Sequence, residues 1–184
     1  MKGVIFNLLE QVVTAEYGAD TWDALLDAAR VEGAYTSLGS YPDEDVYALV
    51  GAAAAHLGLP PEAVLRWFGR HAIALLAERY RGFFEGHAST QTFILTPNSI
   101  IHPEVRKLYP GADVPEFSFD TSSPDITIVQ YQSKRGLCAL AIGMIEGPAD
   151  FFGECATVIE VGCPHRGNPL CTFEVALAAR EQAA

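Results

Sequence analysis

Apolar residues change their spacing at Pro110-Gly111, and this change constrains the fold more than any other feature of the sequence. Before that point they recur every three or four residues, as from Val4 to Val13, which is typical of helices with one buried face. Beyond it, residues 116–120 and 126–132 alternate between apolar and polar, as strands do. Residues 157–161 and 170–175 are expected to form two further strands.

The pattern therefore predicts an α+β fold with two parts. A helical part of about residues 1–110 packs on a part of about residues 111–178, which has a roughly four-stranded antiparallel sheet and helices. With 184 residues the chain has the length of one domain, which we place at residues 1–178, with a tail over 179–184. The predicted helices span residues 4–17, 21–30, 42–57, 61–80 and 137–152, and a helical region over 90–109 is interrupted by Pro97 and Pro103.

The chain is acidic, with 12 Lys and Arg against 23 Asp and Glu and a formal net charge of −11. We expect neither a nucleic acid nor an acidic membrane as partner, because both bind basic surfaces. No apolar run approaches the ~18 residues that a membrane span needs. The first residues lack the pattern of a signal peptide, so we expect a cytoplasmic protein. Its four cysteines should then be reduced thiols or metal ligands rather than disulfides.

Two groups of residues could carry chemistry. His102 precedes Pro103 on an interrupted helix and could present its imidazole to an apolar cavity, although neutral imidazole is also a frequent core or surface group. Tyr131, Ser133 and Arg135 would point to one face of a strand. Together they suit a carboxylate ligand, while a solvated edge strand is the alternative interpretation. The sequence contains no metalloprotease, phosphate-loop or nucleophile-elbow motif.

These residues, in this order, resemble the heme-nitric oxide/oxygen binding (H-NOX) family, which includes the heme domain of soluble guanylate cyclases. The resemblance runs over residues 1–178 and includes the Met-Lys-Gly start, Tyr41-Pro42-Asp43 and Trp67-Phe-Gly-Arg70. It continues through His102-Pro-Glu-Val-Arg-Lys-Leu-Tyr-Pro-Gly111 to the Tyr131-x-Ser-x-Arg135 motif that marks the family.

The resemblance implies heme b between the two parts of the fold. His102 would be the axial ligand of the iron, and Tyr131, Ser133 and Arg135 would bind the propionates. Pro115 and Ile5 occupy positions where family members press on the porphyrin, and distortion of the porphyrin is one control on heme chemistry. The remaining expected pocket residues carry no hydroxyl or amide, and they are Leu9, Ala72, Leu76, Leu140 and Met144.

Family members that hold oxygen have a tyrosine where this chain has Leu140. A hydrogen-bond donor stabilises the polar oxygen adduct in an apolar pocket, and nitric oxide does not need such a donor. The resemblance therefore implies a sensor for NO and CO that excludes O2. Binding of NO would loosen His102 and shift the helical part against the sheet.

Three cysteines match a zinc site found in some NO-sensing members of the family: Cys138, Cys163 and Cys171. The family's fourth ligand is a histidine three residues before the second cysteine, where this chain has Glu160, and His165 could substitute for it. Zinc with three thiolates and a carboxylate is an unusual set, and a redox-active or merely buried group of thiols is the alternative. Cys155 is expected to be buried near a strand.

The sensor should not be an enzyme, because acid–base chemistry on bound oxygen needs a polar residue beside the iron. We expect the chain to regulate a separate polypeptide, and family members of this type are paired with a histidine kinase or a cyclic-di-GMP enzyme. The alternative function is a heme-free or zinc-only interaction module with the same fold.

Overall fold

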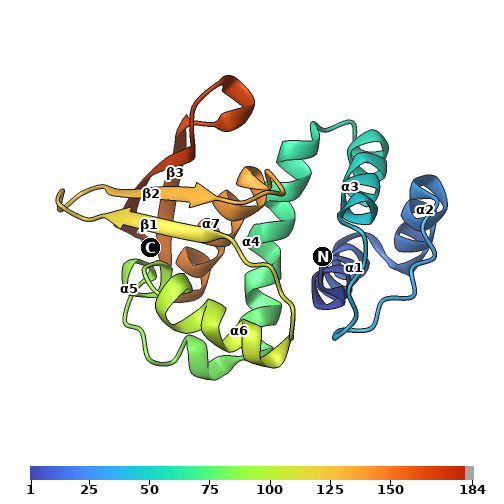
Figure 1. Ribbon diagram of the computed structural model, residues 1–184, viewed down its shortest axis with the longest axis horizontal. Helices are drawn as coiled ribbons and strands as arrows, with labels where there is room; N and C mark the ends of the chain where they lie inside the picture. Colours follow the sequence, from blue (N-terminus) through green and yellow to red (C-terminus); the bar gives the residue numbers. More distant parts are fainter. Residues whose placement is uncertain (181–184) are drawn as a thin grey trace.

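The structure is a computed structural model that describes residues 1–180. Helices dominate its first 108 residues and a sheet with one long helix follows, as the sequence predicts (Figure 1). The helices are α1 (Gly3–Tyr17), α2 (Ala19–Ala29), α3 (Asp43–Leu57), α4 (Pro61–Arg79), α5 (Thr90–Ile94), α6 (His102–Leu108) and α7 (Cys138–Phe152). Short turns of other helix types lie at η1 (Arg81–Phe83), η2 (Pro97–Ile101) and η3 (Pro164–Arg166).

The four strands form one antiparallel sheet in the order β1-β2-β4-β3. Side chains alternate across it, so that Val129 of β2 and Phe173 of β4, which are paired in register, both face the core. The predicted α+β class and the four-stranded antiparallel sheet are therefore confirmed. The strands are β1 (Glu116–Asp120), β2 (Thr127–Gln132), β3 (Glu154–Gly162) and β4 (Cys171–Ala179).

The last two strands are longer than predicted. The tail that we expected to begin at residue 179 does not, because Ala179 still pairs with Glu154 in the sheet. Residues 181–184 lie outside the described part of the chain. Alanine is a poor strand former by itself, and the backbone pairing to β3 overrides this preference.

Two hydrophobic cores meet along α4. The first core joins α1, α2 and α3 to the first half of α4 and contains Phe6, Leu49 and Phe68. The second core joins the last turns of α4 to α7 and the sheet, and Ile73 and Phe173 belong to it. The chain changes from helix to strand near Pro110, whereas the boundary between the two cores runs through α4, which stands between the two parts of the molecule (Figure 1).

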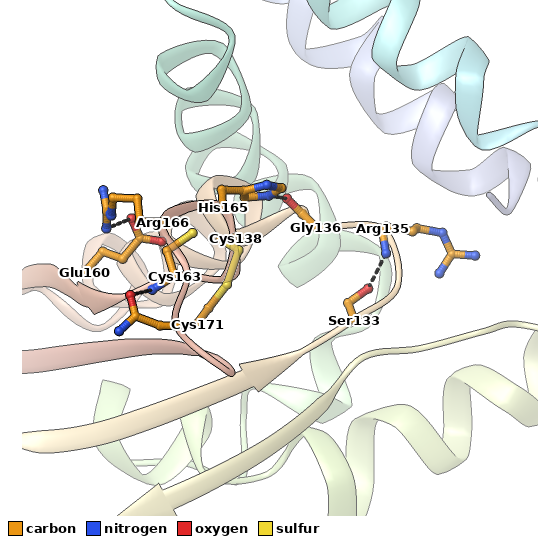
Figure 2. Close-up of a disulfide and its surroundings, with 10 residues drawn as sticks. Ser133, Arg135, Gly136, Cys138, Glu160, Cys163, His165, Arg166 and Cys171 are labelled. Carbon is orange, nitrogen blue, oxygen red and sulfur yellow. Dashed lines mark hydrogen bonds and ion pairs between the residues drawn. A yellow bond between two sulfur atoms is a disulfide. The ribbon is translucent and has the colours of Figure 1, made fainter.

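A disulfide joins Cys138 at the start of α7 to Cys171 at the start of β4, with their Cα atoms 6.5 Å apart (Figure 2). The expectation that none of the four cysteines is paired is therefore wrong for these two. The sheet folds back over α7 and brings together residues 33 positions apart, within the span that a disulfide bridges. Cys155 was expected to be buried, and this is also wrong, because its side chain points out of the solvent face of β3.

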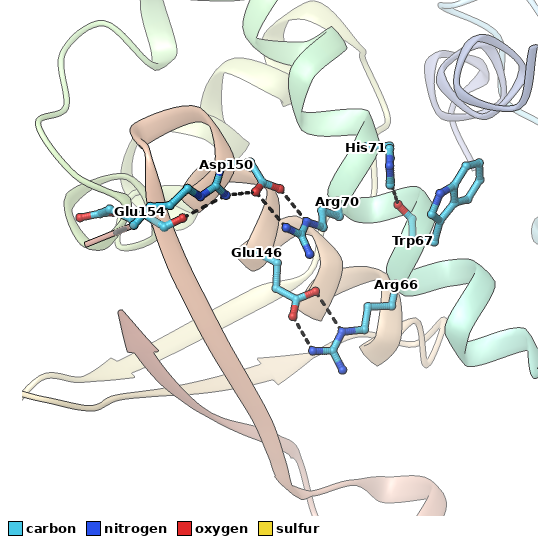
Figure 3. A network of polar contacts seen from close by, with 8 residues as sticks. Arg66, Trp67, Arg70, His71, Glu146, Asp150 and Glu154 are labelled. Carbon is cyan, nitrogen blue, oxygen red and sulfur yellow. Dashed lines mark hydrogen bonds and ion pairs between the residues drawn. The ribbon is translucent and has the colours of Figure 1, made fainter. Parts of the chain in front are cut away.

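Helices α4 and α7 cross in backbone contact. A Cβ atom on Gly69 would lie 2.4 Å from the carbonyl oxygen of Leu140, and one on Gly143 would lie 2.0 Å from that of Arg66. Two ion pairs flank the crossing, one between Arg66 and Glu146 and one between Arg70 and Asp150 (Figure 3). Glycine is required at this crossing because any side chain would push the two helices apart.

None of the helices within residues 1–180 is by itself both long and apolar enough to cross a membrane. Together α3 and α4 would meet the length and composition needed, but the chain bends by 106° between them.

Candidate functional site

A large cavity opens between the two cores, with a volume of about 430 Å³. Its wall is mostly apolar and comes from both cores, with Ile5 and Leu8 on one side and Ile145 and Phe93 on the other. A cavity of this size, apolar with a few polar groups, is typical of a site for a cofactor or small molecule. The fold therefore provides a binding site between its two parts.

His102 lines this cavity from the first residue of α6. The preceding residues form a π-turn, η2, in which the Ile101 amide donates to the carbonyl of Thr96, and Pro103 follows in the first turn of α6. Burial, followed by the positive charge of Arg106, lowers the pKa of His102 from 6.5 to about 4. The imidazole is thus neutral at ordinary pH, which is the form that can bind a metal.

Tyr131, Ser133 and Arg135 all line the same cavity. Tyr131 is buried on β2, and its burial raises the pKa of the phenol, which therefore stays protonated. We predicted that all three residues lie on one face of a strand, and this is wrong for Ser133 and Arg135. The strand ends at Gln132, and these two residues lie in the turn that follows it. The Ser133 hydroxyl accepts a hydrogen bond from the Arg135 amide at 3.2 Å (Figure 2). Beyond this turn, Arg135 lines the cavity.

Two aspartates from separate segments of the chain hold Arg135. Its Nε lies 2.8 Å from Oδ2 of Asp43, and Nη1 donates to the carbonyl of Asp113 at 2.8 Å. The carboxylate of Asp113 also lies 3.5 Å from Nη1. A largely buried guanidinium beside an apolar cavity fits a ligand that carries carboxylates, as heme does.

Most of the predicted pocket residues reach the cavity. It is lined by Pro115, Ile5, Leu76, Leu140 and Met144. Leu9 and Ala72 are fully buried in the first core and do not line it. Leu9 instead lines a second, smaller apolar cavity among α1, α2, α3 and α4.

Sequence reasoning missed several polar residues of the site. Asp43 and Asp113 are far from Arg135 in the chain, and nothing in the local pattern indicated that they would pair with it. Tyr80 and Tyr109 also line the cavity, and their hydroxyls are hydrogen-bonded to each other. Both tyrosines directly follow a helix, and that position was the only signal in the sequence.

The cysteine cluster lies beyond the turn that carries Arg135. One ligand atom from each of Cys138, Cys163, Cys171 and Glu160 lies within 4.8 Å of the other three. Glu160 forms an ion pair with Arg166, and His165 turns away, with its Nε2 3.2 Å from the carbonyl of Gly136 (Figure 2). The structure thus brings Glu160 to the three sulfurs and leaves His165 outside.

Comparison with known proteins was consistent with this arrangement. The sequence profile of the family described as Haem-NO-binding matches residues 2–160. An H-NOX protein from Shewanella oneidensis, solved in the Fe(II)NO ligation state, is 29% identical with a TM-score of 0.89, and the match covers 96% of this chain and 99% of that one.

Two further structures are also similar. An H-NOX from Shewanella woodyi, solved in the Fe(II)CO ligation state, is 29% identical with a TM-score of 0.80, covering 100% of this chain and 97% of that one. The unliganded Fe(II) H-NOX from K. algicida is 22% identical with a TM-score of 0.86 over 100% of both chains, a likeness that concerns the fold. The match of the family profile to most of the chain, together with the shared fold, shows that the chain belongs to the Haem-NO-binding family, whose solved members are called H-NOX proteins.

Proposed function

We propose that the chain is a heme-based sensor that binds NO and CO at ferrous heme b, excludes O2 and signals to a separate protein. One observation carries this proposal: His102 and the Tyr131, Ser133 and Arg135 set line one apolar cavity of about 430 Å³. The cavity combines a neutral imidazole, donors for carboxylates and an apolar wall, which are the three things that heme requires.

His102 would be the axial ligand, and heme, when bound, supplies a ferrous iron at which diatomic gases bind. Tyr131 and Ser133 offer hydroxyls to the propionates, and Arg135 offers its positive charge. Since Asp43 and Asp113 already hold the guanidinium, they fix its position for this contact. Two similar structures, solved in the Fe(II)NO and Fe(II)CO ligation states, support the choice of gases.

The exclusion of oxygen rests on the α7 side of the cavity. Leu140 and Met144 face it there, and neither can donate a hydrogen bond. Without a donor on this side of the cavity, the polar oxygen adduct loses a stabilisation that NO and CO do not need. The pocket thus discriminates by withholding an interaction.

The signal would pass through α6. None of the residues of this helix is fully buried, and Val105 is the residue within it that packs against the first core. We expect that release of His102 frees the start of α6 and shifts the helical part against the sheet. In this proposal the chain is a sensor and not an enzyme.

The receiver would be a separate cytoplasmic enzyme, such as a histidine kinase or a cyclic-di-GMP enzyme. The surface charge supports a basic partner, because residues 1–60 carry nine acidic and only two basic side chains. The same charge disfavours nucleic acid and acidic membranes as partners.

We also propose that the reduced cysteine cluster binds zinc through Cys138, Cys163, Cys171 and Glu160. Their ligand atoms lie within 4.8 Å of one another, close to the ~3.8 Å that separates ligands around tetrahedral zinc. Zinc and the Cys138–Cys171 disulfide exclude each other, because a metal needs both sulfurs as thiolates.

Metal analysis of the reduced protein should find one zinc per chain. Glu160→Ala should weaken its retention against a chelator and Glu174→Ala should not, and equal retention by both variants would remove Glu160 from the ligand set.

The proposed function is tested by replacing His102 with glycine. His102→Gly should lose heme on purification and regain it when imidazole is supplied, because free imidazole can take the place of the side chain. His87 lies in a loop and does not line the cavity, so His87→Gly is the control and should keep heme. Normal heme content and normal NO spectra in His102→Gly without imidazole would show that the axial assignment is wrong.

A further inference from the structure

Two tyrosines connect the C-terminal ends of α4 and α6. Tyr80 follows the last residue of α4 and Tyr109 follows the last residue of α6. Their hydroxyls are hydrogen-bonded, although the two residues are 29 positions apart in the chain, and both rings line the cavity.

Tyr109 attaches the end of α6 to the first core. The helix itself has no buried residue, whereas Tyr109 is only 8% exposed and belongs to the first core. Its amide donates to the carbonyl of Val105 at 2.8 Å, so the backbone of Tyr109 continues the last turn of α6. The position of α6 therefore depends on what holds the Tyr109 ring.

Tyr80 is attached to a rigid element. Its amide donates to the carbonyl of Leu76 at 2.8 Å, and Leu76 itself lines the cavity. Helix α4 is in backbone contact with α7 through Gly69 and Gly143, so its end has little freedom to move. A hydroxyl held by Tyr80 is thus fixed with respect to α7 and the sheet.

The bond between the two phenols persists over the ordinary pH range. Burial, followed by the hydrogen bond with Tyr80, raises the pKa of Tyr109 to about 12. A neutral phenol can donate as well as accept, so the pair needs no third group to complete its hydrogen bond.

We propose that Tyr80 is a positioning residue that holds the end of α6 through the Tyr109 hydroxyl and so sets where His102 stands in the cavity. Tyr80 does not contact the iron ligand and acts through α6. The part of this proposal that concerns the iron–imidazole bond rests on the proposed function, while the tether itself does not.

The tether is tested by hydrogen exchange of the full chain as purified. Tyr80→Phe removes one hydroxyl and keeps the ring, and it should speed exchange of the amides in the last turn of α6 by roughly five-fold, the factor expected for one net hydrogen bond. Tyr17→Phe, which removes a hydroxyl on an exposed side chain, is the control and should leave these amides unchanged.

Tyr109→Phe removes the same bond from its other side and provides a second variant. The double variant should exchange no faster than either single one, because only one bond is lost in each case. Unchanged exchange in α6 for both single variants, or additive effects in the double variant, would overturn the tether.

The effect on His102 is read from the iron–imidazole stretching band of the ferrous heme protein by resonance Raman spectroscopy. Tyr80→Phe should broaden this band, since α6 then samples more positions, and Tyr17→Phe should not. Faster exchange in α6 with an unchanged band would keep the tether and reject its role in placing His102. Absence of heme from the wild-type chain would reject the proposed function and leave the exchange test standing.

Discussion

At the scale of single residues, burial decides the chemistry of the site. His102 stands in an apolar cavity that lowers its pKa to about 4, and Tyr131 stays a neutral phenol for the same reason. The guanidinium of Arg135 forms ion pairs with the carboxylates of Asp43 and Asp113. One cavity therefore contains a neutral imidazole that can bind a metal and a guanidinium that can bind a carboxylate.

The lowered pKa of His102 predicts how the stability of the heme-free protein depends on pH. Between pH 4 and 6.5 the unfolded chain binds a proton on His102 that the folded chain does not, so stability rises with pH in this window. The shift from 6.5 to about 4 corresponds to about 3 kcal/mol.

Urea unfolding at a series of pH values measures this effect, with His102→Gln as the control that lacks the titrating group. The pKa values of Asp43 and Asp150 are also lowered, but from 3.8, so their contribution is lost only at lower pH. An equally steep rise between pH 4 and 6.5 in His102→Gln would show that another group is responsible.

Leu140 predicts the choice of gas at the residue scale. Its side chain is 9% exposed and lines the cavity, so Leu140→Tyr would place a hydroxyl there. Oxygen affinity of the ferrous protein should increase by about tenfold, the effect of one hydrogen bond to a polar adduct. Leu140→Phe adds the ring without the donor and should show no gain. Oxygen affinity that is equal in the two variants would mean that position 140 does not face the bound gas.

At the scale of elements, the crossing of α4 and α7 connects the two hydrophobic cores. Its glycines bring the two backbones into contact, and the ion pairs of Arg66 with Glu146 and Arg70 with Asp150 hold the helices in register (Figure 3). This arrangement makes the pair a rigid frame on which the cavity wall is built.

Substitution of Gly143 measures how tight this crossing is. A Cβ atom there would lie 2.0 Å from the carbonyl oxygen of Arg66, so Gly143→Ala should destabilise the protein by about 2–3 kcal/mol. Gly51 lies on α3 with no atom within 4 Å of the same added atom, so Gly51→Ala should be neutral or slightly stabilising. Denaturant unfolding compares the two variants, and equal stabilities would contradict the close packing.

The elements were more predictable than their contacts. Helical spacing and glycine predicted α1 closely, and alternation predicted β1 at its observed residues. The last residues of β4 were not predicted as strand, because the alanines there form a strand only through pairing with β3. The partners of Arg135 and the Tyr80–Tyr109 bond could not be predicted, since they depend on which distant segments the fold brings together.

At the scale of the whole molecule, two cores enclose a cavity that neither forms alone. The first core supplies Ile5 and Leu8 to its wall, and the second supplies Phe93 and Ile145. A ligand that fills this space touches both parts of the molecule, so its state can change how the two parts sit against each other. In the function that we propose, the acidic helices of the first core would move with respect to the sheet, and a basic partner would detect this movement.

We propose above all that this cavity holds heme on His102 with the propionates at Tyr131, Ser133 and Arg135. The visible spectrum of the full chain, expressed with ample heme supply and reduced, tests this proposal. We expect about one heme per chain, a ferrous band that shifts when NO is added, and no shift in air. A folded protein without colour under these conditions would contradict it.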